Sequence, residues 1–86
     1  MKCALNIVGG IWLKRPLDII VTHVPDGVII ENESLDLWGE GNTYFDALED
    51  FTDFFLYEYD AYLKTPIESM DLISRRRREA YLKLRR

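Results

Sequence analysis

The feature that most constrains this chain is a stripe of large apolar side chains recurring every three or four residues through its middle. The stripe consists of Tyr44, Leu48, Phe51, Phe55, Tyr59 and Tyr62. This spacing places all six side chains on one side of an α-helix. Thr43 is positioned to accept the amide hydrogen of Asp46 as an N-cap. The helix is therefore predicted over residues 43–64, a length of about 33 Å, and its stripe needs a second layer to cover it.

The forty residues before this helix are predicted to supply that layer. Residues 3–8 and 17–22 alternate with period two, which is typical of β-strands. Residues 24–28, Val-Pro-Asp-Gly-Val, indicate a hairpin turn, because proline presets its φ and glycine adopts positive φ easily. Residues 35–38 alternate once more and stop at Gly39. We therefore predict an α+β fold, in which an antiparallel meander of three or four strands within residues 1–40 is covered by the long helix.

A second helix is predicted directly after the first. Residues 65–68, Thr-Pro-Ile-Glu, have the order of a capping box with proline at the first helical position. This basic C-terminal helix would cover residues 66–86, with Met70, Ile73, Tyr81 and Leu84 on one face and Arg77 interrupting it. Because the first helix is longer than a small sheet is wide, part of its apolar surface is expected to meet the last helix or another subunit.

Length and composition limit what the chain can be. Its 86 residues form a single domain, and a domain this small is marginally stable alone, which favours a homodimer, a higher oligomer or another partner. No apolar run approaches the roughly 18 residues that a membrane helix needs. Asn6 interrupts the apolar start, and Lys14 and Arg15 stand where a secretory cleavage site would have small residues. We therefore expect mature structure from the first residue and a cytoplasmic location.

Signals for catalysis are weak. The sequence has no glycine-rich loop followed by lysine and no HExxH or CxxC spacing. The single Cys3 and the lone His23 are too few for a zinc site, and we interpret His23 as a packed or rim residue of a strand. Carboxylates at residues 31, 33, 36 and 40 could gather a divalent metal, but solvent-facing strand positions explain most of them. We predict no enzyme, no metal site and no cofactor.

Charge is divided between two parts of the chain. Residues 1–74 hold 4 basic and 14 acidic side chains, a net charge of −10, whereas residues 75–86 hold 7 basic and 1 acidic, a net charge of +6. A partner with a basic, RNA-binding surface would be steered towards the acidic part and blocked from RNA. The predicted binding face consists of Glu40, Asp46, Glu49, Asp50 and Asp53. In the competing interpretation, these residues form an ordinary solvated face, or the two parts neutralise each other within a monomer or across a dimer.

The basic part is the candidate for contact with nucleic acid. Its arginines are Arg75, Arg76, Arg77, Arg78, Arg85 and Arg86. Four consecutive arginines spread around more than one helical turn, so they cannot all face one groove, and each phosphate contact would add salt-dependent affinity. The competing interpretation is structural: arginines near a C-terminus complement the helix dipole and bond the acidic first helix.

Residues 31–43, Glu-Asn-Glu-Ser-Leu-Asp-Leu-Trp-Gly-Glu-Gly-Asn-Thr, followed by Asp-Ala-Leu-Glu-Asp-Phe at residues 46–51, resemble a family pattern. An extended strand, a Gly-x-Gly-x-Thr turn and a helix with an alanine–leucine pair form the core of small HicB-like antitoxin domains and their uncharacterised archaeal relatives. The resemblance covers residues 17–63 and is weaker in the last helix. The two glycines also have a structural explanation as sources of backbone freedom, and the threonine as a cap.

The resemblance implies a truncated ribonuclease H-like arrangement without a catalytic metal site. It also implies that the protein neutralises a toxin that degrades messenger RNA. This chain has no room for the DNA-binding domain that often follows in that family. We therefore predict a non-enzymatic protein-binding module of a toxin–antitoxin system. The alternatives are a small nucleic-acid-binding regulator that uses the arginine-rich helix, and a homo-oligomeric structural module.

Overall fold

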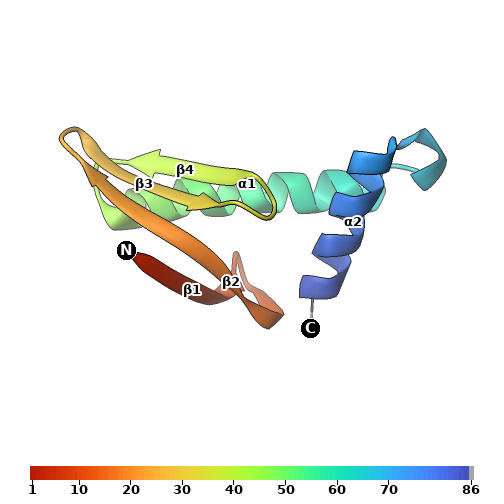
Figure 1. Cartoon of the computed structure of the whole chain (residues 1–86), viewed down its shortest axis with the longest axis horizontal. Coiled ribbons are helices and arrows are strands. Elements are labelled where there is room, and N and C mark those ends of the chain that lie inside the picture. Colours follow the sequence, from red (N-terminus) through yellow and green to blue (C-terminus); the bar gives the residue numbers. More distant parts are fainter. Residues whose placement is uncertain (86) are drawn as a thin grey trace.

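The computed structural model of the chain describes residues 1–85 and has an α+β fold, as the sequence predicts (Figure 1). Its elements are the strands β1 (Lys2–Val8), β2 (Ile11–Val24), β3 (Gly27–Asn32) and β4 (Leu37–Gly41), the helix α1 (Tyr44–Lys64), the short 3₁₀ helix η1 (Ile67–Ser69) and the helix α2 (Leu72–Leu84). The four strands form one antiparallel sheet in the order β1-β2-β3-β4. The meander and the single long helix are therefore confirmed.

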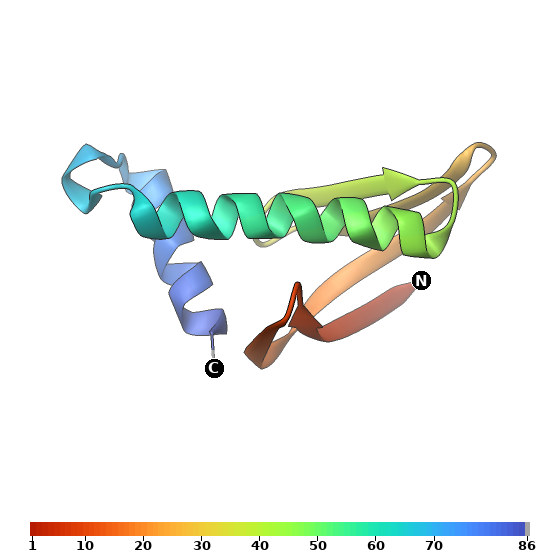
Figure 2. The same ribbon diagram turned by 180° about the vertical axis from the view of Figure 1, so that it is seen from behind.

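Helix α1 covers only part of the sheet. It lies along β3 and β4, while the β1–β2 hairpin diverges from it, and α2 crosses the far end of α1 at a steep angle (Figures 1 and 2). The hairpin twists where residues 13–16 of β2 stand opposite the single Asn6 of β1, at a break in the register. Pro16 lies in this break, where a residue without an amide hydrogen does not interrupt a regular ladder.

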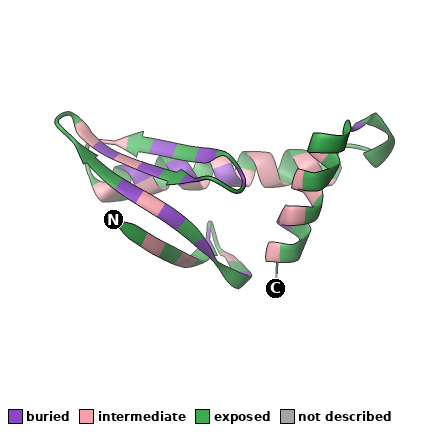
Figure 3. Ribbon diagram, in the orientation of Figure 1, coloured by how far each residue is buried: buried purple, intermediate pink, exposed green. Residues whose placement is uncertain are grey.

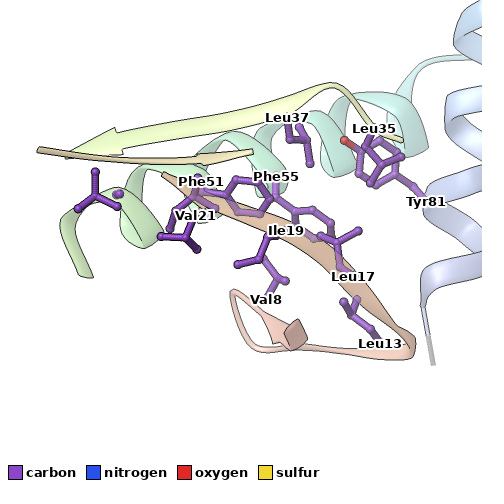
Figure 4. Close-up of a cluster of buried hydrophobic side chains, with 13 residues drawn as sticks. Val8, Leu13, Leu17, Ile19, Val21, Leu35, Leu37, Phe51, Phe55 and Tyr81 are labelled. Carbon is purple, nitrogen blue, oxygen red and sulfur yellow. The ribbon is translucent and has the colours of Figure 1, made fainter. Parts of the chain in front are cut away.

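The core lies between the sheet and α1 and extends to α2 (Figure 4). Side chains of β2 and β3 alternate between this core and the opposite face, so Leu17, Ile19 and Val21 are buried. Phe51 and Phe55 of α1 are fully buried against them, and Tyr81 is the buried anchor of α2. Buried positions concentrate on the strands and the first half of α1, whereas α2 is mostly exposed or half-buried (Figure 3).

Glycines in β4 let α1 approach this strand very closely. A Cβ atom on Gly39 would lie 2.3 Å from the backbone nitrogen of Phe51, and one on Gly41 would lie 2.6 Å from that of Ala47. Neither glycine has a positive φ. The interpretation of these two glycines as sources of backbone freedom is therefore wrong: they are needed because a side chain would collide with the helix backbone. Ala47, itself fully buried, is the matching small residue on α1.

The turn before β4 differs from the predicted strand over residues 35–38. Residues 33–36 form a turn in which Asp36 has a φ of +54°, a left-handed conformation that aspartate tolerates better than most residues. Strand β4 begins at Leu37, two residues after the predicted start at Leu35, and continues through Gly39 and Gly41. Asn32 stabilises this turn, because its side-chain oxygen accepts the amide hydrogen of Leu35 at 2.8 Å and its side-chain amide donates to the carbonyl of Asp18 at 2.7 Å.

The predicted start of the last helix at Pro66 is wrong. Thr65 instead ends α1, where its hydroxyl donates to the carbonyl of Ala61 at 2.7 Å, and η1 follows. Helix α2 starts at Leu72 with Asp71 as its N-cap, whose carboxylate accepts the amide hydrogen of Ser74 at 2.8 Å. On the predicted apolar face of this helix Tyr81 is buried as expected, but Ile73 is 66% exposed.

Candidate functional site

Four of the five predicted acidic residues share one side of the first half of α1. Asp46, Glu49, Asp50 and Asp53 stand at positions i, i+3, i+4 and i+7, which brings them together on a helix surface. All four are exposed, because the residues between them, Ala47 and Phe51, point into the core. The stripe and the carboxylates thus divide α1 into an inner and an outer side.

A hydrogen bond joins the fifth residue to this surface. The backbone amide of Glu40 in β4 donates to Oδ2 of Asp50 at 2.9 Å. Glu40 is itself exposed, and because Gly39 and Gly41 on either side of it face α1, its side chain points to the opposite face of the sheet. We call this surface, formed by Glu40, Asp46, Glu49, Asp50 and Asp53, the acidic face. The structure therefore gathers four of the five carboxylates on one helix surface and joins the fifth residue, Glu40, to it through its backbone amide.

The acidic face has no basic partner within the described part of the chain. The ion pairs there are Lys64 with Asp60 at 3.1 Å and Arg77 with Asp36 at 3.8 Å, and neither involves the face. Closely spaced carboxylates without counter-charges raise the negative potential over that surface. The face is thus not neutralised by ion pairs from residues 1–85.

Two exposed aromatic rings flank the acidic face along α1. The side chain of Phe45 is 77% exposed and that of Tyr57 is 73% exposed. A shallow groove lined by Asp50, Asp53, Phe54, Tyr57 and Glu58 joins the face to the second ring. Phe45 was not predicted as part of a site. Its position directly after the stripe residue Tyr44, about 100° around the helix, is the signal that places it outside the core.

The arginines of α2 are not gathered on one surface. Arg75 donates through Nε to the carbonyl of Ile67 at 3.1 Å, and Arg77 donates through Nη1 to the carbonyl of Leu35 at 3.2 Å. Nε of Arg78 is buried, and no hydrogen-bond partner for it is found among residues 1–85. Two of the predicted residues thus hold α2 against neighbouring backbone.

The remaining predicted arginines fall into three situations. Arg76 is exposed on α2, and Arg85 is exposed after α2, where it forms an isolated bridge with Leu13 of β2. Arg86 lies outside the described residues. Arg77 pairs with Asp36 in the β3–β4 turn, and neither ion pair among residues 1–85 joins an arginine of α2 to a carboxylate of α1. The competing interpretation that these arginines bond the acidic first helix is therefore wrong for residues 75–85.

The pKa values of Asp71, the N-cap of α2, and of Tyr81 within α2 are shifted from their usual values. Hydrogen bonding from the Ser74 amide holds the pKa of Asp71 below its usual value. Burial raises the pKa of Tyr81 well above its usual value, and the negative charge of Glu58 and the neighbouring Tyr62 add to that effect. Tyr81 is fully buried, and its hydroxyl has no hydrogen-bond partner in the described structure. Neither group belongs to the acidic face. Asp71 caps α2, and Tyr81 packs α2 against the core.

Within residues 1–85, no three His, Cys, Asp or Glu side chains come together in a way that could hold a metal ion. Among the helices of that range, none combines the length and the apolar character needed to cross a membrane. Comparison with protein-family models, curated proteins and solved structures gave no match.

Proposed function

We propose that this protein is a non-enzymatic binding module that uses its acidic face to bind a basic protein. The observation that carries the proposal is the concentration of four exposed carboxylates on the first half of α1, with Glu40 of β4 bonded to one of them through its amide. None of the five residues forms an ion pair with the described residues. Such a surface accelerates the encounter with a positively charged partner and excludes acidic ones. The exposed rings of Phe45 and Tyr57 supply apolar area that carboxylates alone lack.

The resemblance of residues 17–63 to HicB-like antitoxins supplies the class of partner. We propose that the partner is a small basic protein that cleaves RNA, and that the acidic face occupies its RNA-binding surface. In such a complex the carboxylates stand in for the phosphates of the substrate. Inhibition then needs no chemistry on the side of this protein, only a tighter fit than RNA achieves.

The first test is co-expression with the product of the adjacent gene, when that gene encodes a short basic protein. We expect the toxin alone to arrest growth and this protein to restore it. The variant D46N/E49Q/D50N/D53N should fail to restore growth. Its affinity for the purified toxin should fall roughly thirtyfold, because each exposed charge pair contributes about 0.5 kcal/mol.

A matched control separates the acidic face from total charge. The variant D26N/E31Q/E33Q/E68Q changes the net charge by the same amount, at acidic positions elsewhere on the chain. We expect this control to bind and to restore growth like the unmodified protein. Equal losses in the two variants would refute the acidic face as the docking surface, and so would binding that is insensitive to both.

The alternative function, binding of nucleic acid through α2, makes a different prediction. Binding of a labelled RNA or DNA duplex would weaken steeply with salt, and the change of residues 75–78 from arginine to glutamine would abolish it. Because Arg75 and Arg77 are engaged with backbone carbonyls, we expect no binding of either duplex even at low salt. Tight, salt-dependent binding in that titration would favour the alternative.

A further inference from the structure

The two edges of the sheet differ in how their backbone groups are used. At the β4 edge the outward amide of Glu40 is already bonded to Asp50, and α1 lies directly beside the strand. At the other edge, β1 packs mainly against β2, and α1 lies over β3 and β4 instead. A free edge is a template for a further strand. The sheet therefore has one covered edge and one free edge.

The hydrogen-bond pattern shows which groups of β1 face outward. Met1 and Val21 exchange two backbone bonds, each 2.7 Å long. Antiparallel pairs alternate between bonded and non-bonded, so Cys3 and Leu5 bond to β2, whereas Lys2 and Ala4, which precede the break in the register at Asn6, direct their amides and carbonyls to the free edge. These two alternating outward positions can start a short antiparallel ladder.

We infer that this free edge pairs with the same strand of a second copy, antiparallel and centred on Ala4. In this register Ala4 faces Ala4, Lys2 faces Asn6 of the second copy, and Cys3 faces Leu5 of the second copy. The outward groups of Ala4 in the two copies then bond to each other, and the four strands of each copy join into one sheet. The inference is independent of the acidic face, which lies at the opposite edge.

Charge favours this edge over the other. Residues 1–17 contain no acidic side chain, and the only charge on β1 is that of Lys2. In the register centred on Ala4, the two copies of Lys2 are offset by four residues, about 14 Å, which exceeds the screening length of about 8 Å at physiological salt. Pairing through β4 would instead bring two acidic faces together and would first require the bond between Asp50 and Glu40 to break.

The side chains of β1 also gain cover in such a pair. Cys3 and Leu5 point to the core side but are only half-buried, and Ile7 is 43% exposed. A ladder of this length buries less area than a standard interface, so we expect dissociation constants in the micromolar range. The dimer should therefore form and dissociate within the range of concentrations that sedimentation can follow.

The first experiment measures mass against concentration from roughly 10 to 500 µM by analytical ultracentrifugation. We expect the unmodified chain to reach twice its mass of 10.1 kDa. The variant Ala4→Pro should remain monomeric, because proline removes one outward amide hydrogen that the isolated fold does not use. A monomer throughout that range would overturn the inference, and so would an Ala4→Pro dimer of unchanged affinity.

The second experiment does not depend on the folding of the proline variant. In a Cys3→Ser background, a thiol is introduced at the free edge by Ala4→Cys or, as the matched control, at the β4 edge by Glu40→Cys. Directly opposed residues in a bonded pair have Cα atoms about 5.5 Å apart, within the span of a disulfide. We expect oxidation to give a covalent dimer for the free-edge variant alone. Equal cross-linking of the two variants, or none in the free-edge variant, would refute the inference.

Discussion

The first half of α1 packs against β3 and β4, whereas its second half packs against α2, and the two contacts are built differently. In the first, backbone meets backbone: Gly39 and Gly41 leave no room for a Cβ atom beside Phe51 and Ala47. In the second, rings meet rings. Tyr81 of α2 packs against Phe55, Tyr59 and Tyr62, with ring centroids 5.6 Å, 5.9 Å and 5.6 Å away.

This difference indicates how each contact responds to change. A backbone contact cannot shift to admit new atoms, because both partners belong to hydrogen-bonded elements. A ring cluster made by one residue of a short helix can separate without disturbing the sheet. We therefore expect the backbone contact between α1 and β4 to govern the folding of the whole chain, and the ring cluster to govern only the docking of α2.

The largest effect should come from adding a side chain to the backbone contact. Gly39→Val would place atoms within 2.3 Å of the Phe51 backbone nitrogen, and we expect it to lower the free energy of unfolding by about 4 kcal/mol, measured by urea denaturation. Gly10→Asn is the control, because a Cβ atom there meets nothing within 4 Å and asparagine tolerates the left-handed φ of +80°. Similar losses in the two variants would contradict the proposed role of Gly39.

The next effect should come from removing the ring that anchors α2. Tyr81→Ala takes a fully buried side chain out of the cluster, and we expect a loss of about 3 kcal/mol. Amide hydrogen exchange should show faster exchange in α2 while the strands remain protected. Tyr57→Ala, at an exposed ring, should cost less than about 0.5 kcal/mol. Equal loss of protection in the strands would show that the two contacts are not separable.

A smaller effect of opposite sign should follow when only the hydroxyl is removed. The hydroxyl of Tyr81 is buried and has no partner among residues 1–85, so Tyr81→Phe should raise the free energy of unfolding by about 1 kcal/mol. No gain in stability would show that the hydroxyl is bonded in solution.

The same substitution should change the response to alkaline pH. Burial raises the pKa of Tyr81, so above about pH 10 the unfolded chain loses a proton that the folded chain keeps. Stability therefore falls as pH rises, by up to about 1.4 kcal/mol per pH unit for this group. Tyr81→Phe should remove that contribution, which urea denaturation at several pH values would measure.

The smallest effect concerns the N-caps of the two helices. The Ser74 amide lowers the pKa of Asp71, so this cap stabilises α2 above the usual aspartate pKa of about 3.9 and is lost as pH falls through the lower folded value. We expect the amide of Ser74 to exchange faster below that range, and Asp71→Asn to abolish this dependence. Thr43, which caps α1 with an uncharged hydroxyl, should show no such change.

The two contacts also differ in how far the sequence predicts them. The alternation over residues 3–8 and 17–22, the hairpin turn within residues 24–28 and the stripe of α1 are local patterns, and the strands, turn and helix that they predict are confirmed. The threonine and proline at residues 65 and 66 suit the start of a helix as well as the end of one. The hydroxyl of Thr65 donates a hydrogen bond to the carbonyl of Ala61 at the end of α1, and Asp71 is the residue that caps the start of α2. Local sequence does not distinguish these two uses.

The candidate site also has a part that local sequence predicts and a part that depends on how distant residues pack. The spacing of Asp46, Glu49, Asp50 and Asp53 predicts a common helix surface, and their exposure agrees with it. The bond between Asp50 and the amide of Glu40 depends on how α1 lies on β4, which involves residues far apart in the chain. The role of Gly39 and Gly41 depends on the same packing, and for that reason the sequence pointed to backbone freedom instead.

The bond between Asp50 and Glu40 also limits how many copies can assemble. A sheet that can accept a further strand at both edges can elongate without end, as fibres do, whereas a sheet that can accept a strand at one edge stops growing once that edge is occupied. In this molecule the carboxylate of Asp50 already bonds the outward amide of Glu40 and so blocks strand addition at one border of the sheet. Any assembly built by strand addition on the other border is therefore finite, and it presents the two acidic faces at its outer ends.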